Sequence, residues 1–167
     1  DGASVISLRG FVATGTWALY RVPTTGPGKA EELIHREVDP RRTVARSPLA
    51  ISPDSRWLVF GTGASFTAYS EGVFAARLDT SPVKATAVYP TPEWSQRVRG
   101  ARISPDSSRL VLFADHLFGV PLPGGPADLV RLDEGDADGI GTPSRATITP
   151  DSTRVVFVMD DSQPGGA

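Results

Sequence analysis

One short phrase, which occurs three times, constrains this chain more than any other feature. It reads LAISPDSRWLVF at 49–60, ARISPDSSRLVL at 101–112 and ATITPDSTRVVF at 146–157. The aspartates of the three copies are 52 and 45 residues apart, and DGASVIS at the N-terminus aligns with the second half of the phrase. Self-similarity at this period indicates a repeat architecture, in which each unit packs against its neighbours.

Each repeat holds the pattern of four short strands, separated by turns rich in Pro, Gly and Asp. In the second unit the expected strands are 49–51, 57–60, 72–78 and 84–89. In the third unit they are 101–103, 109–113, 117–122 and 127–132. Four strands in a repeat of this length are typical of one blade of a β-propeller. We therefore expect an all-β fold, a β-propeller segment of about three four-stranded antiparallel blades.

The repeat divides the chain into four units. Residues 1–44 form a blade that lacks its inner strand, 45–95 and 96–139 form full blades, and 140–167 form the first half of a blade. Because three blades are too few to close a ring, we expect the segment to belong to a larger ring of about six to eight blades. Further blades or a second copy of the chain would complete it.

Two local expectations follow from this division. The outer edges of strands 5–8 and 154–159 should be paired by polypeptide outside these residues, because bare sheet edges invite aggregation. Residues 30–37 have good helix propensity, which leaves a helical turn open there. The register of the repeat favours a fourth strand at 31–35 instead.

The Ser/Thr-Pro-Asp-Ser core of the phrase predicts a tight turn. Proline presets φ at the second position, and Asp accepts hydrogen bonds from nearby backbone N–H groups. Because these residues recur at equivalent positions, we assign them a structural role in the turn. They are Ser52, Pro53, Asp54, Ser104, Pro105, Asp106, Thr149, Pro150 and Asp151.

The phrase, together with GVPLPGG at 119–125, resembles the repeat of TolB-like β-propellers. The usual phrase of that family has Gly after the Asp, where this chain has Ser55, Ser107 and Ser152. We expect these turns either to avoid a positive φ at that residue or to accept strain there. The resemblance implies a non-catalytic bacterial scaffold, periplasmic or extracellular, that binds a protein or peptide.

Two other functions stay open for such a segment. One is the propeller that gates a prolyl-oligopeptidase-like serine hydrolase, whose catalytic domain is absent from these residues. The other is the propeller of a polysaccharide lyase or of a small-ligand-binding protein. Because one fold hosts many functions, the repeats do not choose among them.

Charge and motifs argue against several other classes. The formal net charge of −2 gives no basic field for nucleic acid, and no apolar run approaches the ~18 residues of a membrane helix. With no cysteines, disulfides and thiolate metal sites are excluded. There is no G-x-S-x-G elbow, and adjacency in a strand would point His116 and Asp115 to opposite faces. We expect no catalytic residue, no cofactor, no nucleic-acid partner and no membrane insertion.

The acidic run at 133–139 is the one candidate metal loop. Glu134, Asp136 and Asp138 stand where positions 1, 3 and 5 of a calcium loop would be. Position 12 would then be Arg145 instead of the bidentate Glu. This defect favours a solvated loop, so we expect no metal.

Four arginines near the starts of the inner strands are the candidate ligand-binding residues: Arg46, Arg99, Arg102 and Arg145. The family resemblance places the inner strands along the central channel, so these side chains would lie on its rim. Guanidinium groups can hold carboxylate or phosphate groups bidentately. The alternative is that they are solvated and pair with acidic residues of neighbouring loops: Asp133, Asp136 and Asp138.

Overall fold

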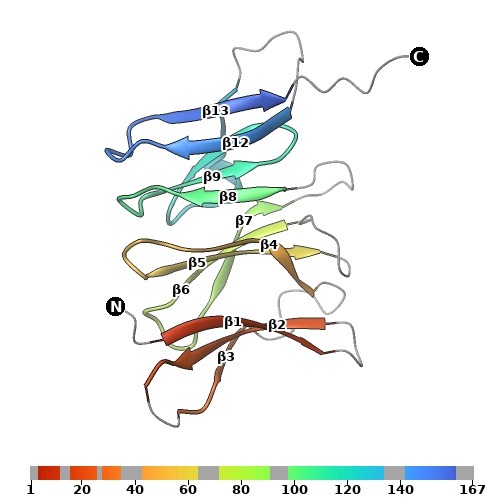
Figure 1. Ribbon diagram of the computed structural model, residues 1–167, viewed down its shortest axis with the longest axis vertical. Helices are drawn as coiled ribbons and strands as arrows, with labels where there is room; N and C mark the ends of the chain where they lie inside the picture. Colours follow the sequence, from red (N-terminus) through yellow and green to blue (C-terminus); the bar gives the residue numbers. More distant parts are fainter. Residues whose placement is uncertain are drawn as a thin grey trace, which may run out of the picture.

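The structure, a computed structural model, is a stack of antiparallel sheets. It describes residues 4–11, 16–25, 28–34, 43–63, 72–90, 98–133 and 142–160. These residues contain thirteen β-strands, one short 3₁₀-helix and no α-helix; no helix among them is long and apolar enough to cross a membrane. Figure 1 shows the four sheets lying one above another. The expected all-β fold with four-stranded antiparallel blades, a β-propeller segment, is confirmed.

The sheets follow the repeat along the chain. The first has the order β1-β2-β3, with β1 (Ser4–Phe11), β2 (Thr16–Pro23) and β3 (Glu31–Ile34). The second has the order β4-β5-β6-β7, with β4 (Thr43–Ile51), β5 (Trp57–Gly63), β6 (Gly72–Arg77) and β7 (Ala85–Pro90). The third has the order β11-β10-β9-β8, with β8 (Gly100–Ile103), β9 (Arg109–Phe113), β10 (Leu117–Pro121) and β11 (Val130–Arg131). The last pairs β12 (Thr142–Ile148) with β13 (Val155–Asp160).

Strands β5 and β9 each carry an apolar run, 58–60 and 110–113, that is buried on both faces. Side chains of a strand alternate between its faces, so Leu58 and Phe60 pack toward the first sheet, while Val59 packs toward the third. In β9 the alternate residues Val111 and Phe113 pack toward the last sheet. Each side chain of this size that is fully buried contributes about 1.5–3 kcal/mol. The sheets are therefore joined by apolar layers.

The Ser/Thr-Pro-Asp-Ser phrase folds in the same way in its three copies. At the end of β8, the Ser107 N–H donates to the Ser104 carbonyl oxygen over 2.8 Å, which closes a tight turn. The Ser104 hydroxyl donates to the Asp106 carboxylate (2.6 Å) and accepts the Arg109 N–H (2.9 Å). The Asp106 carboxylate also accepts the Ser108 N–H over 3.0 Å. Equivalent bonds are made by Ser52, Asp54, Thr149 and Asp151.

The serine that follows each motif Asp adopts a positive φ. The values are 61° for Ser55, 63° for Ser107 and 60° for Ser152. The expectation that these serines avoid a positive φ is wrong. The alternative expectation, that the turns accept backbone strain at this residue, is the one that agrees with the structure. A tight turn that closes a hairpin in this way needs a left-handed residue after it, and a non-glycine residue there costs about 1 kcal/mol.

A hydrogen bond between sheets explains why serine fits this position. The Ser107 hydroxyl oxygen accepts the backbone N–H of Asp54, in the neighbouring sheet, over 3.1 Å. The Ser152 hydroxyl oxygen accepts the N–H of Asp106 over the same distance. Such a bond contributes about 1 kcal/mol, which offsets the strain and which glycine could not supply.

The fourth strand of the third blade is shorter than expected. Instead of a strand over 127–132, the chain forms a 3₁₀-helix, η2 (Pro126–Asp128), followed by the two residues of β11. Proline suits the first helical position because it lacks an N–H. The Asp128 carboxylate accepts the Gly125 N–H over 2.9 Å, which favours the turn over a strand.

Strands β4 and β12 begin earlier than the expected starts at 49 and 146. The pairing register shifts between Val44 and Leu49 in β4 and between Pro143 and Arg145 in β12. Such irregularities let a strand continue past a proline, which cannot donate to the ladder. Arg46 and Arg145 consequently lie within strands and not in the loops before them.

Acid should destabilise the protein through the repeated turns. Hydrogen bonds from Ser104 and Ser108 hold the pKa of Asp106 at about 2, and the pKa values of Asp54 and Asp151 are also lowered, chiefly by the hydroxyls of Ser52 and Thr149. A lowered pKa in the folded state adds stability that is complete above the unfolded value of about 3.9 and is lost as the pH falls through the folded value. We predict that the melting temperature falls between about pH 4 and 2.

Replacing Asp106 with Asn should make that fall smaller, because the amide does not titrate. Thermal unfolding followed by circular dichroism from pH 7 to 2 measures this. An identical acid dependence in wild type and Asp106→Asn would contradict the assignment.

Candidate functional site

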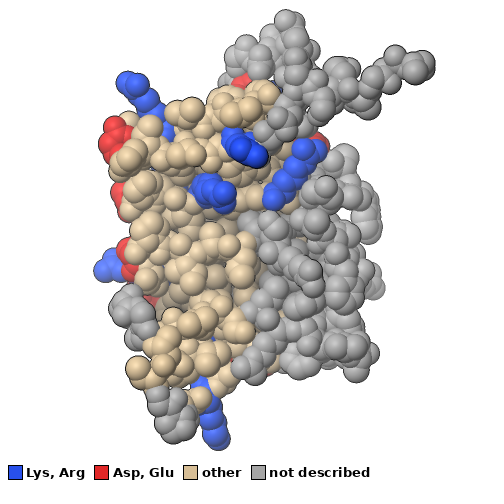
Figure 2. All heavy atoms as spheres, in the orientation of Figure 1, with Lys and Arg blue, Asp and Glu red and all other residues tan. Residues whose placement is uncertain are grey.

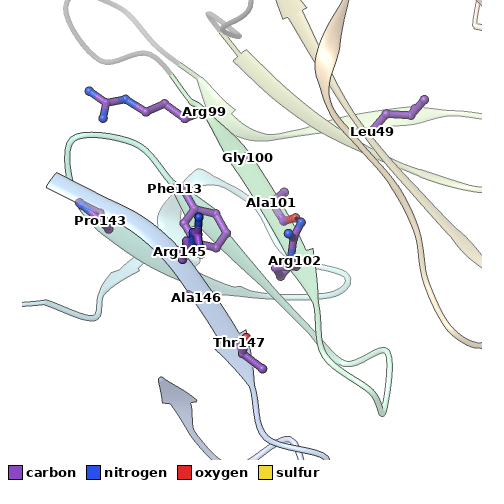
Figure 3. A pocket seen from close by; sticks show the side chains of 10 residues that line it. All are labelled: Leu49, Arg99, Gly100, Ala101, Arg102, Phe113, Pro143, Arg145, Ala146 and Thr147. Atoms are coloured by element: carbon purple, nitrogen blue, oxygen red, sulfur yellow. Dashed lines mark hydrogen bonds between the residues drawn. The ribbon is translucent and has the colours of Figure 1, made fainter. Parts of the chain in front are cut away.

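A groove of about 510 Å³ opens beside β8 and β12, each of which is an edge strand of its sheet. Figure 3 shows the side chains around it, with Arg99 projecting near the start of β8 and Leu49 on the far side. The groove is lined by Leu49, Arg99, Gly100, Ala101, Arg102, Phe113, Pro143, Arg145, Ala146 and Thr147. Most of these residues are apolar, and the charged ones are all arginines.

Strand alternation holds two of the arginines toward solvent. In β8, Ala101 is buried against the core and the next residue, Arg102, is exposed. In β12, Ala146 is buried, and its neighbours Arg145 and Thr147 are exposed. Because successive side chains point to opposite faces of a strand, each buried alanine turns its neighbours outward.

The groove is electropositive. The Arg102 guanidinium donates to the Ala101 carbonyl oxygen over 3.0 Å, and the Arg99 guanidinium lies 3.7 Å from the Asp115 carboxylate at the rim. The Arg145 side chain has no hydrogen bond or ion pair with the part of the chain that the structure describes. None of the lining residues is acidic, and Figure 2 shows blue side chains gathered on this face over β8 and β12.

This arrangement suits a ligand that is both anionic and partly apolar. Guanidinium groups bind carboxylates and phosphates through paired N–H donors. Among the lining residues, the large apolar side chain that is exposed is Leu49, at 40%, whereas Phe113 and Pro143 are buried. A strongly hydrated anion would gain nothing from Leu49, whereas a carboxylate on an apolar body would use both parts.

The structure brings three of the four candidate arginines to one groove: Arg99, Arg102 and Arg145. Arg46 lies in β4, but its side chain is outside the described part of the chain. The turn residues lie elsewhere, since Ser104 to Asp106 follow the other end of β8 from Arg99. The groove is thus separate from the repeated turns.

Sequence reasoning missed a buried acidic site at the end of β11. The Asp133 carboxylate is 1% exposed and accepts the Arg131 Nε–H over 2.7 Å and the Leu117 N–H over 3.2 Å. The His116 Nδ1 lies 3.2 Å from its second oxygen. The proposed pairing of Asp133 with the groove arginines is therefore wrong; Asp136 and Asp138 lie outside the described residues. The spacing of Arg131 and Asp133, two residues apart where β11 ends, was the available signal.

Electrostatics make Asp133 a structural anchor. Burial by itself raises the pKa of this carboxyl, but the hydrogen bonds from Arg131, Leu117 and His116 outweigh it, so the pKa is lowered and the group is ionised. The carboxylate ties the turn between β9 and β10 to the end of β11. It does not point into the groove, since it is not among the lining residues.

The described residues show no catalytic or metal-binding constellation. Asp115 and His116 lie in the turn between β9 and β10, not in a strand as expected, and they have separate partners, Arg99 and Asp133. No group of three His, Asp or Glu side chains among the described residues could hold a metal ion. The acidic loop at 134–139 and His35 lie outside that part of the chain.

Comparison with known proteins adds little to the fold. No protein-family model matches the chain, and no curated protein matches it. Among solved structures, the chain is similar to one from a study of two prolyl endopeptidases and the role of their inter-domain dynamics in catalysis and specificity. That match has 14% identity, covers 87% of this chain and 27% of the other, and has a TM-score of 0.35. A likeness this weak carries no argument about activity.

Loss of the Asp133 carboxylate should destabilise the protein strongly. Asp133→Ala leaves the buried Leu117 N–H without its acceptor and the partly exposed Arg131 guanidinium without its ion pair, which we expect to lower the free energy of unfolding by about 2 kcal/mol. The control is His116→Ala, whose side chain is 40% exposed and whose loss should cost less than about 1 kcal/mol. Urea denaturation measures both, and equal effects would contradict the anchor role.

Proposed function

We propose that this protein is a TolB-like, non-catalytic propeller scaffold that binds a protein or peptide through the groove beside β8 and β12. One observation carries the proposal: three arginines, one in β8, one in β12 and one just before β8, line an open groove with no acidic lining residue. Arginine is enriched at the centres of protein interfaces.

The polar groups of the groove favour a macromolecular ligand. Small-molecule sites enclose most of their ligand and aim a few buried polar groups at it. Here the arginines are exposed at the rim, and the buried lining residues are apolar: Ala101, Phe113, Pro143 and Ala146. An exposed cationic rim fits a partner that brings its own carboxylates.

The finer parts of the proposal rest on the sequence. The Ser/Thr-Pro-Asp repeats support the TolB-like class, and a TolB-like protein is expected in the periplasm or cell envelope of a bacterium. The contact of His116 with Asp133, whose other partners are Arg131 and Leu117, supports a structural role for this histidine.

Partner capture tests the proposal. Immobilised protein is exposed to an extract of the source organism, and bound proteins are quantified by mass spectrometry. The groove variant is Arg99→Ala/Arg102→Ala/Arg145→Ala. Its matched control, Arg56→Ala/Arg109→Ala/Arg154→Ala, removes the same charge from exposed arginines beside the repeated turns.

We expect a defined partner to be retained by wild type and control, and to be reduced at least about tenfold with the groove variant. Equal retention by all three proteins would overturn the assignment of the groove. Hydrolysis of peptide substrates by the purified protein would overturn the non-catalytic role.

A further inference from the structure

The edges of β8 and β12 carry backbone groups that face away from their partner strands. In an antiparallel pair, residues alternate between those whose N–H and C=O bond the partner strand and those whose groups point to the other side. The Ser104 N–H donates to the Arg109 carbonyl oxygen, so Ser104 and, two residues back, Arg102 face β9. The N–H and C=O groups of Ala101 and Ile103 consequently point to the free edge.

The hydrogen bonding of Ala101 agrees with this alternation. The Ala101 carbonyl oxygen accepts the Arg102 guanidinium instead of a group of β9. The same reasoning applies to β12. The Thr149 N–H donates to the Arg154 carbonyl oxygen, so the backbone groups of Thr149 face the segment that contains Arg154 and those of Ala146, an odd number of residues away, face the other side. Ala101 and Ala146, whose backbone groups are thus directed to the free edges, both line the groove.

We propose that the groove binds an extended acidic peptide, which adds as a strand to the free edge of β8 and places alternate carboxylates against the arginines. This inference rests on the proposed function and names its ligand class. Strand addition satisfies the edge N–H and C=O groups, and side-chain pockets then select the sequence. A bound strand directs alternate residues to opposite sides, at about 6.6 Å per pair of residues.

Charge and hydrophobicity select the peptide. One set of its side chains lies on the face of Arg102, where the groove also presents Arg145. The other set lies on the face of Ala101, toward the exposed Leu49 of β4. A peptide in which Glu alternates with Val matches both. A block arrangement of the same residues keeps the charge but loses the match, because acidic and apolar side chains would then share each side.

The test uses a seven-residue peptide in which Glu and Val alternate, about 23 Å long when extended, capped at both ends and fluorescently labelled. Binding to the full chain is followed by fluorescence anisotropy, with Ala101 and Ile103 amide exchange as a second readout. Two peptide controls are a block sequence of identical composition and an alternating peptide with N-methyl groups on the residues that face β8. Inorganic phosphate and an oligonucleotide serve as competing anions.

We expect the alternating peptide to bind at least about tenfold more tightly than the block and N-methylated peptides, and to protect the Ala101 and Ile103 amides. Arg102→Ala/Arg145→Ala should weaken binding by about tenfold or more, whereas Arg109→Ala/Arg154→Ala should change it less than about twofold. Unchanged melting temperatures show that the variants are folded.

Equal binding of alternating, block and N-methylated peptides would overturn strand addition and leave only charge attraction. Stronger competition by phosphate or oligonucleotide than by the alternating peptide would overturn the ligand class. If the alternating peptide fails to bind while a protein partner is still lost with the groove variant, this inference is wrong and the proposed function stands. If partner capture is also independent of the groove, both are wrong.

Discussion

The hydroxyl oxygen of Ser107 accepts the backbone N–H of Asp54 in the neighbouring sheet, and this bond, repeated between Ser152 and Asp106, fixes how one sheet sits on the next. Apolar layers join the sheets but are not directional. The hydrogen bond is directional, and it lies at the same place in each repeat. The bond requires a serine with a positive φ. The strain of about 1 kcal/mol at this residue therefore accompanies the bond that fixes one sheet on the next.

The groove depends on this stacking. Arg102 and Arg145 come from different sheets, and each is turned outward by a buried alanine beside it. Their distance therefore follows from how the third sheet packs on the last, with Phe113 and Ala146 in the same apolar layer. The anchor at Asp133 secures the third sheet from its outer side, where Arg131 and the turn at His116 meet.

Apolar runs and turn residues are local signals, and they were sufficient to predict the strands of the second and third sheets except the last one, which is shortened to β11. They could not predict the positive φ at Ser107, because the bond that compensates it comes from a residue 53 positions away. The burial of Asp133 against Leu117 and His116 was missed because these partners are 16 and 17 positions away. The convergence of Arg99, Arg102 and Arg145 was expected only from family resemblance, and Arg46 stays a prediction. The early start of β12 depends on an irregular register at Pro143, which no strand pattern encodes.

Amide hydrogen exchange, measured residue by residue by NMR, tests the inter-sheet bond most directly. In Ser107→Ala the Asp54 amide should exchange at least about tenfold faster, while the Asp106 amide, whose acceptor is Ser152, keeps its wild-type rate. In Ser152→Ala the Asp106 amide should be the one affected. An Asp54 amide that exchanges at the same rate in wild type and Ser107→Ala would contradict the role assigned to this bond.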